Sequence, residues 1–187
     1  MQVALDYSGD NGYIIPKKLL LLHSDNQNDK MSTFSFEYQR MPVAELSEPD
    51  RELCRRAAIA TEGSYAPYSN YNVGAALRLA DGTVMAGANQ ENASYPCGTC
   101  AERTALNYAQ ANYPQMAVEA IAVAAAHEQH RGDATSTHRP PYPCGLCRQA
   151  LAETEHRQQT PLKVLLVDGD EAIVIPSASC LLPFTFE

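Results

Sequence analysis

Two short cysteine motifs constrain this sequence of 187 residues more than any other feature. Cys97 and Cys100 are separated by two residues, and so are Cys144 and Cys147. Thiolates at this spacing bind zinc, because two ligands two residues apart can reach one tetrahedral ion from a single turn of chain. The pattern allows two kinds of site: all four cysteines close a structural site, or three hold the ion and leave its fourth position to water.

Three local features favour the site with an open position. Glu102 follows Cys100 by two residues, close enough to reach a water on the same ion. Pro143 precedes Cys144, and its fixed φ suits the start of a helix. Helical character follows both cysteine pairs, and helix N-termini stabilise anionic thiolates. On this interpretation Glu102 moves protons, water takes the fourth position, and the zinc ligands are Cys100, Cys144 and Cys147.

Three stretches of sequence carry a resemblance to a known family: Asn89–Pro96, Cys100–Thr104 and Pro143–Gln149. Together they resemble the cytidine deaminases, and the three-cysteine set is similar to the short-chain, homotetrameric branch of that family. The resemblance runs from about Glu52 to Phe186. It implies a hydrolase of pyrimidine salvage that converts cytidine and 2'-deoxycytidine to uridine and 2'-deoxyuridine with release of ammonia. It also implies one Zn²⁺ per subunit and Glu102 as the acid and base.

The resemblance also implies contacts with the nucleoside sugar. Asn89 and Glu91 match family residues that contact the ribose 3'-hydroxyl. Strand side chains two residues apart point to the same side, and an amide beside a carboxylate can both donate to and accept from a hydroxyl. Without the resemblance, a solvated strand end would be the preferred interpretation of this pair.

Further residues gain roles from the same resemblance. Tyr71 stands where the family usually has the phenylalanine that packs against the pyrimidine, although it could equally be a core tyrosine. Tyr95 and Ala101 are expected in the substrate pocket, and Phe186 is expected to reach a neighbouring subunit's site. Three thiolates around a divalent ion leave a net negative charge, which Arg103 would offset by bonding to the sulfurs.

Composition excludes some partners. The formal net charge is -8, which argues against a protein that binds a phosphate backbone. Tryptophan is absent and only four phenylalanines are present, so few rings could stack on a single strand. The expected substrate is a free nucleoside, with no nucleic acid polymer as partner.

The N-terminal sequence indicates a cytoplasmic protein. Asp6 and Asp10 stand where a secretory signal would be basic, and the apolar run Leu19–Leu22 is too short to cross a membrane. Cysteines at metal spacing also suit a compartment that keeps thiols reduced. Residues 1–30 are polar and are expected to be poorly ordered, and Met31 is a candidate for the true start. The catalytic domain is then 31–187.

Hydrophobic patterns predict the architecture. Alternating strands and helices predict an α/β fold, a three-layer α/β/α sandwich with a mixed five-stranded sheet. Alternation of Phe34, Phe36 and Tyr38 suggests a further edge strand within 32–46. The loop 127–142 is expected at the pocket rim. The predicted helices are 47–63, 100–111 and 144–157, and the predicted strands are 72–79, 83–88, 118–126, 162–167 and 172–175.

Other functions remain open at this point. A four-cysteine zinc module would bind metal without turnover. A redox dithiol protein would have a reactive CxxC, although the sequence lacks the strand that should precede it. A deaminase of another aminopyrimidine or aminopurine would keep zinc and Glu102. We predict that Cys97, which would close the site if it bound zinc, is a free thiol nearby.

Overall fold

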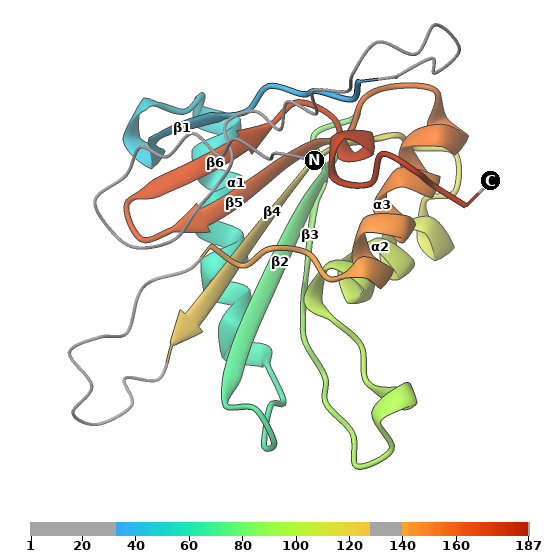
Figure 1. Cartoon of the computed structure of the whole chain (residues 1–187). Coiled ribbons are helices and arrows are strands. Elements are labelled where there is room, and N and C mark those ends of the chain that lie inside the picture. Colours follow the sequence, from blue (N-terminus) through green and yellow to red (C-terminus); the bar gives the residue numbers. More distant parts are fainter. Residues whose placement is uncertain (1–32, 128–139, 187) are drawn as a thin grey trace, which may run out of the picture. The chain divides into compact units, whose positions relative to one another are not determined.

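A computed structural model describes residues 33–127 and 140–186. The chain divides into two units, and the fold described below belongs to the second, Ser35–Glu187. Its centre is a mixed sheet with the strand order β1-β6-β5-β4-β2-β3 (Figure 1). β4 and β5 run parallel, whereas the other neighbouring strands run antiparallel. The strands are β1 (Gln39–Pro42), β2 (Tyr71–Leu79), β3 (Val84–Ala88), β4 (Val118–His127), β5 (Lys163–Asp168) and β6 (Glu171–Ile175).

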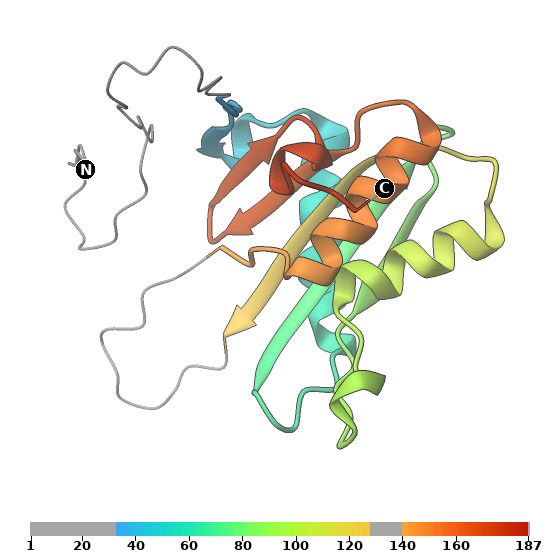
Figure 2. The same cartoon turned by 45° about the vertical axis from the view of Figure 1, so that its right-hand side comes forward.

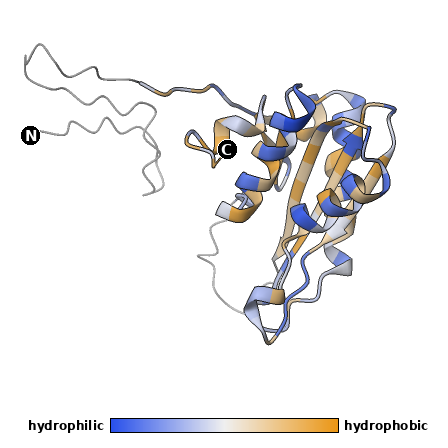
Figure 3. Cartoon of the chain, turned by 90° about the vertical axis from the view of Figure 1, so that its right-hand side faces the viewer, coloured by the Kyte–Doolittle hydropathy of each residue, from blue (hydrophilic) through white to orange (hydrophobic). Residues whose placement is uncertain are grey.

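Helices cover both faces of this sheet. α1 (Glu48–Ala60) packs on one face, and α2 (Ala101–Asn112) and α3 (Gly145–Gln158) pack on the other, as Figures 1 and 2 show. Figure 3 shows apolar strands between helices whose outward sides are polar. The predicted α/β/α sandwich is therefore confirmed. None of the helices in the described segments is long and apolar enough to cross a membrane.

The two faces of the sheet differ in side-chain size. The face under α2 and α3 carries large apolar residues, such as Leu77 of β2 and Ile121 of β4, both fully buried. The face under α1 carries mainly alanines from the same two strands. At Gly74 a Cβ would lie 2.2 Å from the carbonyl oxygen of Ala57, so α1 and β2 are in backbone contact. Small residues on this face therefore set how closely α1 can approach.

Helix starts follow the sequence signals. The side chain of Ser47 caps α1 by accepting from the amide of Asp50, and Pro49 lies in the first turn. α1 ends at Ala60 and a short 3₁₀ turn continues to Gly63, close to the predicted end. Cys100 and Cys144 occupy the equivalent capping positions of α2 and α3. The fold thus places two metal-binding candidates at two helix N-termini.

The sheet has one strand more than predicted. β1 pairs antiparallel with β6, so the expected five-stranded sheet gains a sixth strand at that edge. It begins at Gln39, just after the aromatic alternation that suggested an edge strand in 32–46. Arg40 holds it in place by donating to Glu171 at 2.7 Å and to Asp168 at 3.0 Å. The expectations for 1–30 and for most of the loop 127–142 concern residues outside those described.

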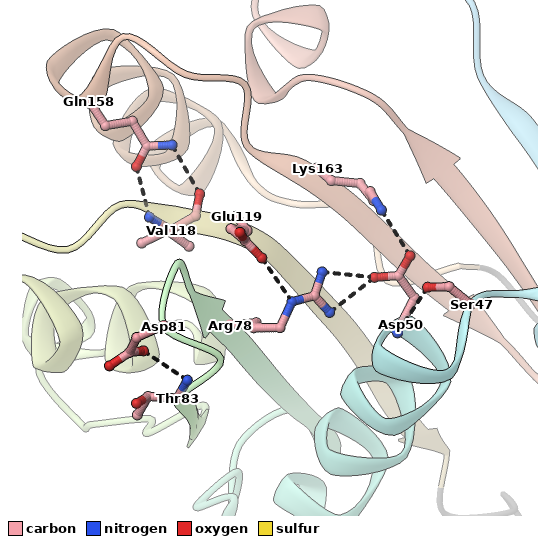
Figure 4. A network of polar contacts seen from close by, with 9 residues as sticks. All are labelled: Ser47, Asp50, Arg78, Asp81, Thr83, Val118, Glu119, Gln158 and Lys163. Carbon is pink, nitrogen blue, oxygen red and sulfur yellow. Dashed lines mark hydrogen bonds and ion pairs between the residues drawn. The ribbon is translucent and has the colours of Figure 1, made fainter.

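A buried ion network joins α1 to the sheet (Figure 4). Asp50 is 5% exposed and accepts from Arg78 at 3.1 Å and from Lys163 at 2.8 Å. Arg78 also donates to Glu119 at 3.2 Å. Burial opposes ionisation of Asp50, but hydrogen bonds, led by that from Lys163, outweigh it and hold the pKa of this carboxyl below its usual range. The network therefore ties the first turn of α1 to β2 and β5.

Candidate active site

Three cysteine sulfurs meet where α2 and α3 begin. The Sγ of Cys144 lies 3.7 Å from the Sγ of Cys100 and 3.5 Å from the Sγ of Cys147. All three sulfurs lie within 4.8 Å of one another. Cys147 projects from the first turn of α3, three residues after Cys144 at its N-cap. Two helix N-termini therefore converge on one cluster of thiols.

This cluster fits a zinc ion. Tetrahedral zinc with Zn–S bonds of about 2.3 Å places its sulfurs about 3.8 Å apart, close to the observed separations. Three sulfurs leave one tetrahedral position for water or substrate. Cys97 is not part of the cluster: it ends an exposed 3₁₀ turn, Tyr95–Cys97, and only the other three cysteines of the two motifs form the group. The chemistry and spacing of the donors thus match an open zinc site.

The thiols of Cys100 and Cys147 do not lose their protons equally easily. A hydrogen bond from the Cys147 thiol, aided by Cys144 and Arg103, lowers the pKa of Cys100 to about 5. The same bond with Cys100, together with burial, raises the pKa of Cys147. Without a cation, the bond that favours the Cys100 thiolate therefore disfavours the Cys147 thiolate. A divalent cation stabilises several thiolates at once, so both can ionise. The cluster is therefore suited to a cation.

Glu102 lies beside the sulfurs in the first turn of α2. It is 5% exposed. Burial raises the pKa of its carboxyl above the usual value, and the charge of Cys100 adds to this effect. A carboxyl whose proton affinity is raised can both take up and release a proton near the cluster. A buried carboxyl with raised proton affinity therefore lies next to the sulfur cluster.

Arg103 lies close enough to the Cys100 sulfur to affect its protonation. Its Nη2 donates to the carbonyl oxygen of Gly98 at 3.2 Å. Its Nε is buried and has no hydrogen-bond partner among the described residues. The charge and hydrogen bonding of this guanidinium contribute to the low pKa of Cys100. A cationic donor in this position suits sulfurs that carry negative charge.

A cleft of about 330 Å³ opens beside this cluster. Three of the predicted substrate residues, Asn89, Glu91 and Tyr95, lie in its wall. Cys100 and Arg103 also contribute, so the cleft borders one cysteine of the cluster. The complete wall consists of Tyr68, Asn89, Gln90, Glu91, Asn92, Tyr95, Gly98, Thr99, Cys100, Arg103 and Leu146.

Two other predicted substrate residues, Tyr71 and Ala101, lie deeper. Ala101 is fully buried as the first residue of α2. Tyr71 is half-buried and packs against the core cluster under α2. Burial raises the pKa of Tyr71, and the charge of Glu102 raises it further, so the two side chains are neighbours. Tyr71 therefore combines a core position with proximity to the site.

Asn89 and Glu91 hold the chain that leads into β2. The Asn89 side chain accepts from the amide of Val73 at 2.8 Å and donates to the carbonyl oxygen of Tyr71 at 2.9 Å. The Glu91 carboxylate accepts from the amide of Tyr68 at 2.8 Å and from both the amide and the hydroxyl of Ser69. These bonds leave one N–H on Asn89, and they leave about one acceptor direction on Glu91.

Phe186 lies away from the cleft of its own chain. Its ring is 86% exposed. Its backbone forms two hydrogen bonds with the Gln149 side chain, one accepted at 3.0 Å and one donated at 3.2 Å. The C-terminal segment is thus fixed to α3 while the ring faces outward.

Sequence reasoning missed three residues of the site. Tyr68 meets Tyr95 edge to face, with ring centroids 6.3 Å apart and an interplanar angle of 89°. Leu146 lies between two ligand candidates and is 66% exposed at the cleft wall. Its position inside the second cysteine motif was an available signal. Tyr68 and Ser69 begin the stretch Tyr68–Leu77, which resembles a segment of the same family, but their hydrogen bonds to Glu91 join residues more than 20 positions apart and have no local signal.

Comparison with known proteins agrees with this geometry. Residues 47–160 match the family model described as the cytidine and deoxycytidylate deaminase zinc-binding region. A cytidine deaminase of Halalkalibacterium halodurans is 50% identical over 105 residues, covering 56% of this chain and 71% of that protein. A crystal structure of cytidine deaminase from Burkholderia pseudomallei is 41% identical, with a TM-score of 0.61, over 75% of this chain and 100% of that one. A cytidine deaminase structure from Mycobacterium tuberculosis is 29% identical, with a TM-score of 0.56, over 73% and 96%. The chain therefore belongs to the zinc-dependent cytidine and deoxycytidylate deaminase family.

Proposed function

We propose that this protein hydrolyses cytidine and 2'-deoxycytidine to uridine and 2'-deoxyuridine, with release of ammonia. One observation carries the proposal: three sulfurs at zinc spacing meet beside the buried carboxyl of Glu102, and one of the three cysteines, Cys100, lies in the wall of a cleft of about 330 Å³. That volume is in the range of small-molecule sites. Membership of the deaminase family supports the same substrate class.

Cys100, Cys144 and Cys147 are the proposed zinc ligands. When bound, zinc lowers the pKa of a water toward neutrality and acts as a Lewis acid. Glu102 takes a proton from the attacking water and gives it to the ring nitrogen beside the amine-bearing carbon. After the C–O bond has formed, Glu102 takes the proton of the new hydroxyl and gives it to the amine. The C–N bond then breaks, the oxygen becomes the carbonyl of the product and ammonia leaves. One carboxyl serves both steps because it alternates between acceptor and donor.

Two groups support this centre. Arg103 offsets the negative charge of three thiolates, so that they do not cancel the acidity that the metal supplies. The amide of Ala101 is one of the first N–H groups of α2, which have no acceptor within the helix. It is therefore suited to donate to an oxygen or nitrogen of the substrate on which negative charge develops during the reaction.

Asn89 and Glu91 suit a sugar hydroxyl after their internal bonds are counted. Asn89 retains one N–H and Glu91 retains about one acceptor direction, which together match a group that both accepts and donates. We assign this pair to the ribose 3'-hydroxyl. Tyr95 forms the wall next to them, and Tyr71 packs against the pyrimidine close to Glu102.

The exposed C-terminal rings support a homotetramer. Phe184 and Phe186 are 91% and 86% exposed, although the segment that carries them is bonded to α3. Large apolar groups in such positions are suited to an interface. We propose that Phe186 enters the site of a neighbouring subunit, that the enzyme acts in the cytoplasm, and that it binds no nucleic acid polymer or membrane. Sedimentation equilibrium of the full chain tests the tetramer.

Ammonia release from cytidine by the zinc-loaded protein tests the reaction. Glu102→Gln should lower turnover roughly 100- to 10,000-fold because general acid–base catalysis is lost, while bound zinc remains. Glu153→Gln makes the same chemical change on an exposed part of α3 and should have no effect. Activity on adenosine or guanosine but not on cytidine would assign another substrate. A fully inactive protein whose zinc has four sulfur ligands by X-ray absorption would instead show a structural site.

A further inference from the structure

Ser69 links two of the residues proposed to hold the nucleoside. Its hydroxyl donates to the Glu91 carboxylate and accepts from the amide of Tyr71 at 3.1 Å. Its own amide donates to the same carboxylate at 3.3 Å. Asn89 in turn donates to the carbonyl oxygen of Tyr71 at 2.9 Å. One hydrogen-bonded chain therefore runs from Glu91 through Ser69 and Tyr71 to Asn89.

The backbone around Ser69 is shaped for this contact. Asn70 has a φ of 54°, in the left-handed region, which asparagine tolerates better than most residues. The Asn70 amide donates to the carbonyl oxygen of Ala66 at 3.0 Å, which closes the turn. This turn places the Ser69 hydroxyl between the carboxylate and the first residue of β2. Strained backbone held by its surroundings is typical of functional loops.

Ser69 can influence the substrate only through its neighbours. Glu91, Asn89 and Tyr68 contribute to the cleft wall, whereas Ser69 is outside that wall. The hydroxyl and amide of Ser69, with the amide of Tyr68, take about three of the four acceptor directions of Glu91. These three donors therefore determine which acceptor direction of the Glu91 carboxylate remains for a ligand.

We propose that Ser69 is a positioning residue for sugar recognition, which turns Glu91 so that its remaining acceptor direction meets the ribose 3'-hydroxyl. This inference rests on the proposed function, because it concerns how the same cleft selects its nucleoside. Ser69 then contributes to the enzyme's preference for nucleosides that carry a 3'-hydroxyl over those that lack it.

The test compares cytidine with 3'-deoxycytidine, which lacks only the 3'-hydroxyl. In Ser69→Ala the carboxylate loses one charge-assisted hydrogen bond, so kcat/KM for cytidine should fall roughly tenfold. For 3'-deoxycytidine the value should change less than about twofold, since the contact with the hydroxyl is already missing. The ratio of the two values should therefore fall roughly tenfold. Ser69→Thr, which keeps the hydroxyl, should restore most of it.

Ser64→Ala is the matched control. Ser64 lies in the same loop, and its hydroxyl donates to the carbonyl oxygen of Val73 at 3.1 Å without touching Glu91. This variant should leave the ratio unchanged. In a Glu91→Gln background, Ser69→Ala should lower the ratio much less than it does in the wild type, because the two changes remove one interaction.

Ser69 is exposed, so the alanine variant is expected to fold. Equal losses on both nucleosides, or no loss on either, would overturn the positioning role and leave the proposed function intact. A zinc-loaded wild-type protein that releases no ammonia from cytidine would overturn the proposed function and this inference with it.

Discussion

The sulfur of Cys100 lies 3.7 Å from the sulfur of Cys144, although 44 residues separate the two cysteines in the sequence. Both are N-caps of helices that pack on the same face of the sheet. A metal ion at this point therefore joins two helices as well as serving chemistry. Stability and metal content are expected to depend on each other in this protein.

Cys147 and Cys97, one cysteine from each motif, should respond differently to substitution. Cys147→Ser should abolish stoichiometric zinc binding, because it removes a buried member of the sulfur cluster. Cys97→Ser should keep one zinc per subunit and most of the activity, because Cys97 is exposed and outside the cluster. Zinc measured by mass spectrometry, with protein from amino acid analysis, checks both. Loss of zinc from Cys97→Ser would show that four cysteines bind the ion.

Removal of zinc should destabilise the fold reversibly. A ligand that binds only the folded state stabilises it by about 2.7 kcal/mol when its free concentration is 100 times its Kd. Chelation should therefore lower the midpoint of thermal unfolding, and added zinc should restore it. The Cys147→Ser protein serves as the control, because its midpoint should not move when zinc is added. An identical midpoint with and without zinc in the wild type would contradict the coupling.

Signals close together in the sequence predicted much of this structure. Ser47 and Pro49 marked the start of α1, and the apolar alternation in β2 marked a strand, although the structure buries both of its faces. The cysteine motifs marked the starts of α2 and α3, and three of their four cysteines cluster in the structure. In each case the signal is a helix cap, a turn or a periodic apolar pattern. A few neighbouring residues determine each of these.

Contacts between distant residues could not be predicted in the same way. β1 has four residues, and its pairing depends on the free edge of β6 and on Arg40. Lys163 bonds to Asp50 across 113 residues. The role proposed for the Ser69 hydroxyl depends on its hydrogen bond to Glu91, which comes 22 residues later. No local pattern encodes such pairs, because the fold that brings them together is set by the whole chain.

Gly74→Ala should destabilise the protein strongly. The added Cβ would lie 2.2 Å from the Ala57 carbonyl oxygen and 2.6 Å from the Thr61 amide nitrogen. Backbone atoms cannot yield as a flexible side chain can, so α1 must move away from β2 at a cost of about 3 kcal/mol. Urea unfolding measures the change. Gly63→Ala is the control, because its Cβ would meet only the Ala88 side chain at 3.6 Å. Equal stability of the two variants would show that α1 adapts.

Asp50→Asn should lower stability at neutral pH and remove part of its acid dependence. The substitution leaves Arg78 and Lys163 without their buried anion, at a cost of about 3 kcal/mol at pH 7. In the wild type the folded-state pKa of Asp50 lies below the unfolded-state value of about 3.9. Its contribution is therefore complete above that value and is lost as the pH falls through the lower, folded-state pKa. The free energy of unfolding should thus fall more steeply below about pH 4 in the wild type than in Asp50→Asn.

Glu52→Gln is the matched control for this experiment. Glu52 also lies in α1 and bonds to Arg55 at 2.6 and 2.7 Å, but that pair is exposed to solvent. Exposed ion pairs contribute little, so the variant should unfold at nearly the same urea concentration as the wild type at pH 7. Urea unfolding at fixed protein concentration, repeated from pH 3 to pH 7, distinguishes the two carboxylates. Parallel pH curves for the wild type and Asp50→Asn would mean that Asp50 titrates alike in the folded and unfolded chains. In that case the stability of the junction between α1 and the sheet would come from packing around Leu53 and Ala57, which are fully buried against the alanine-lined face.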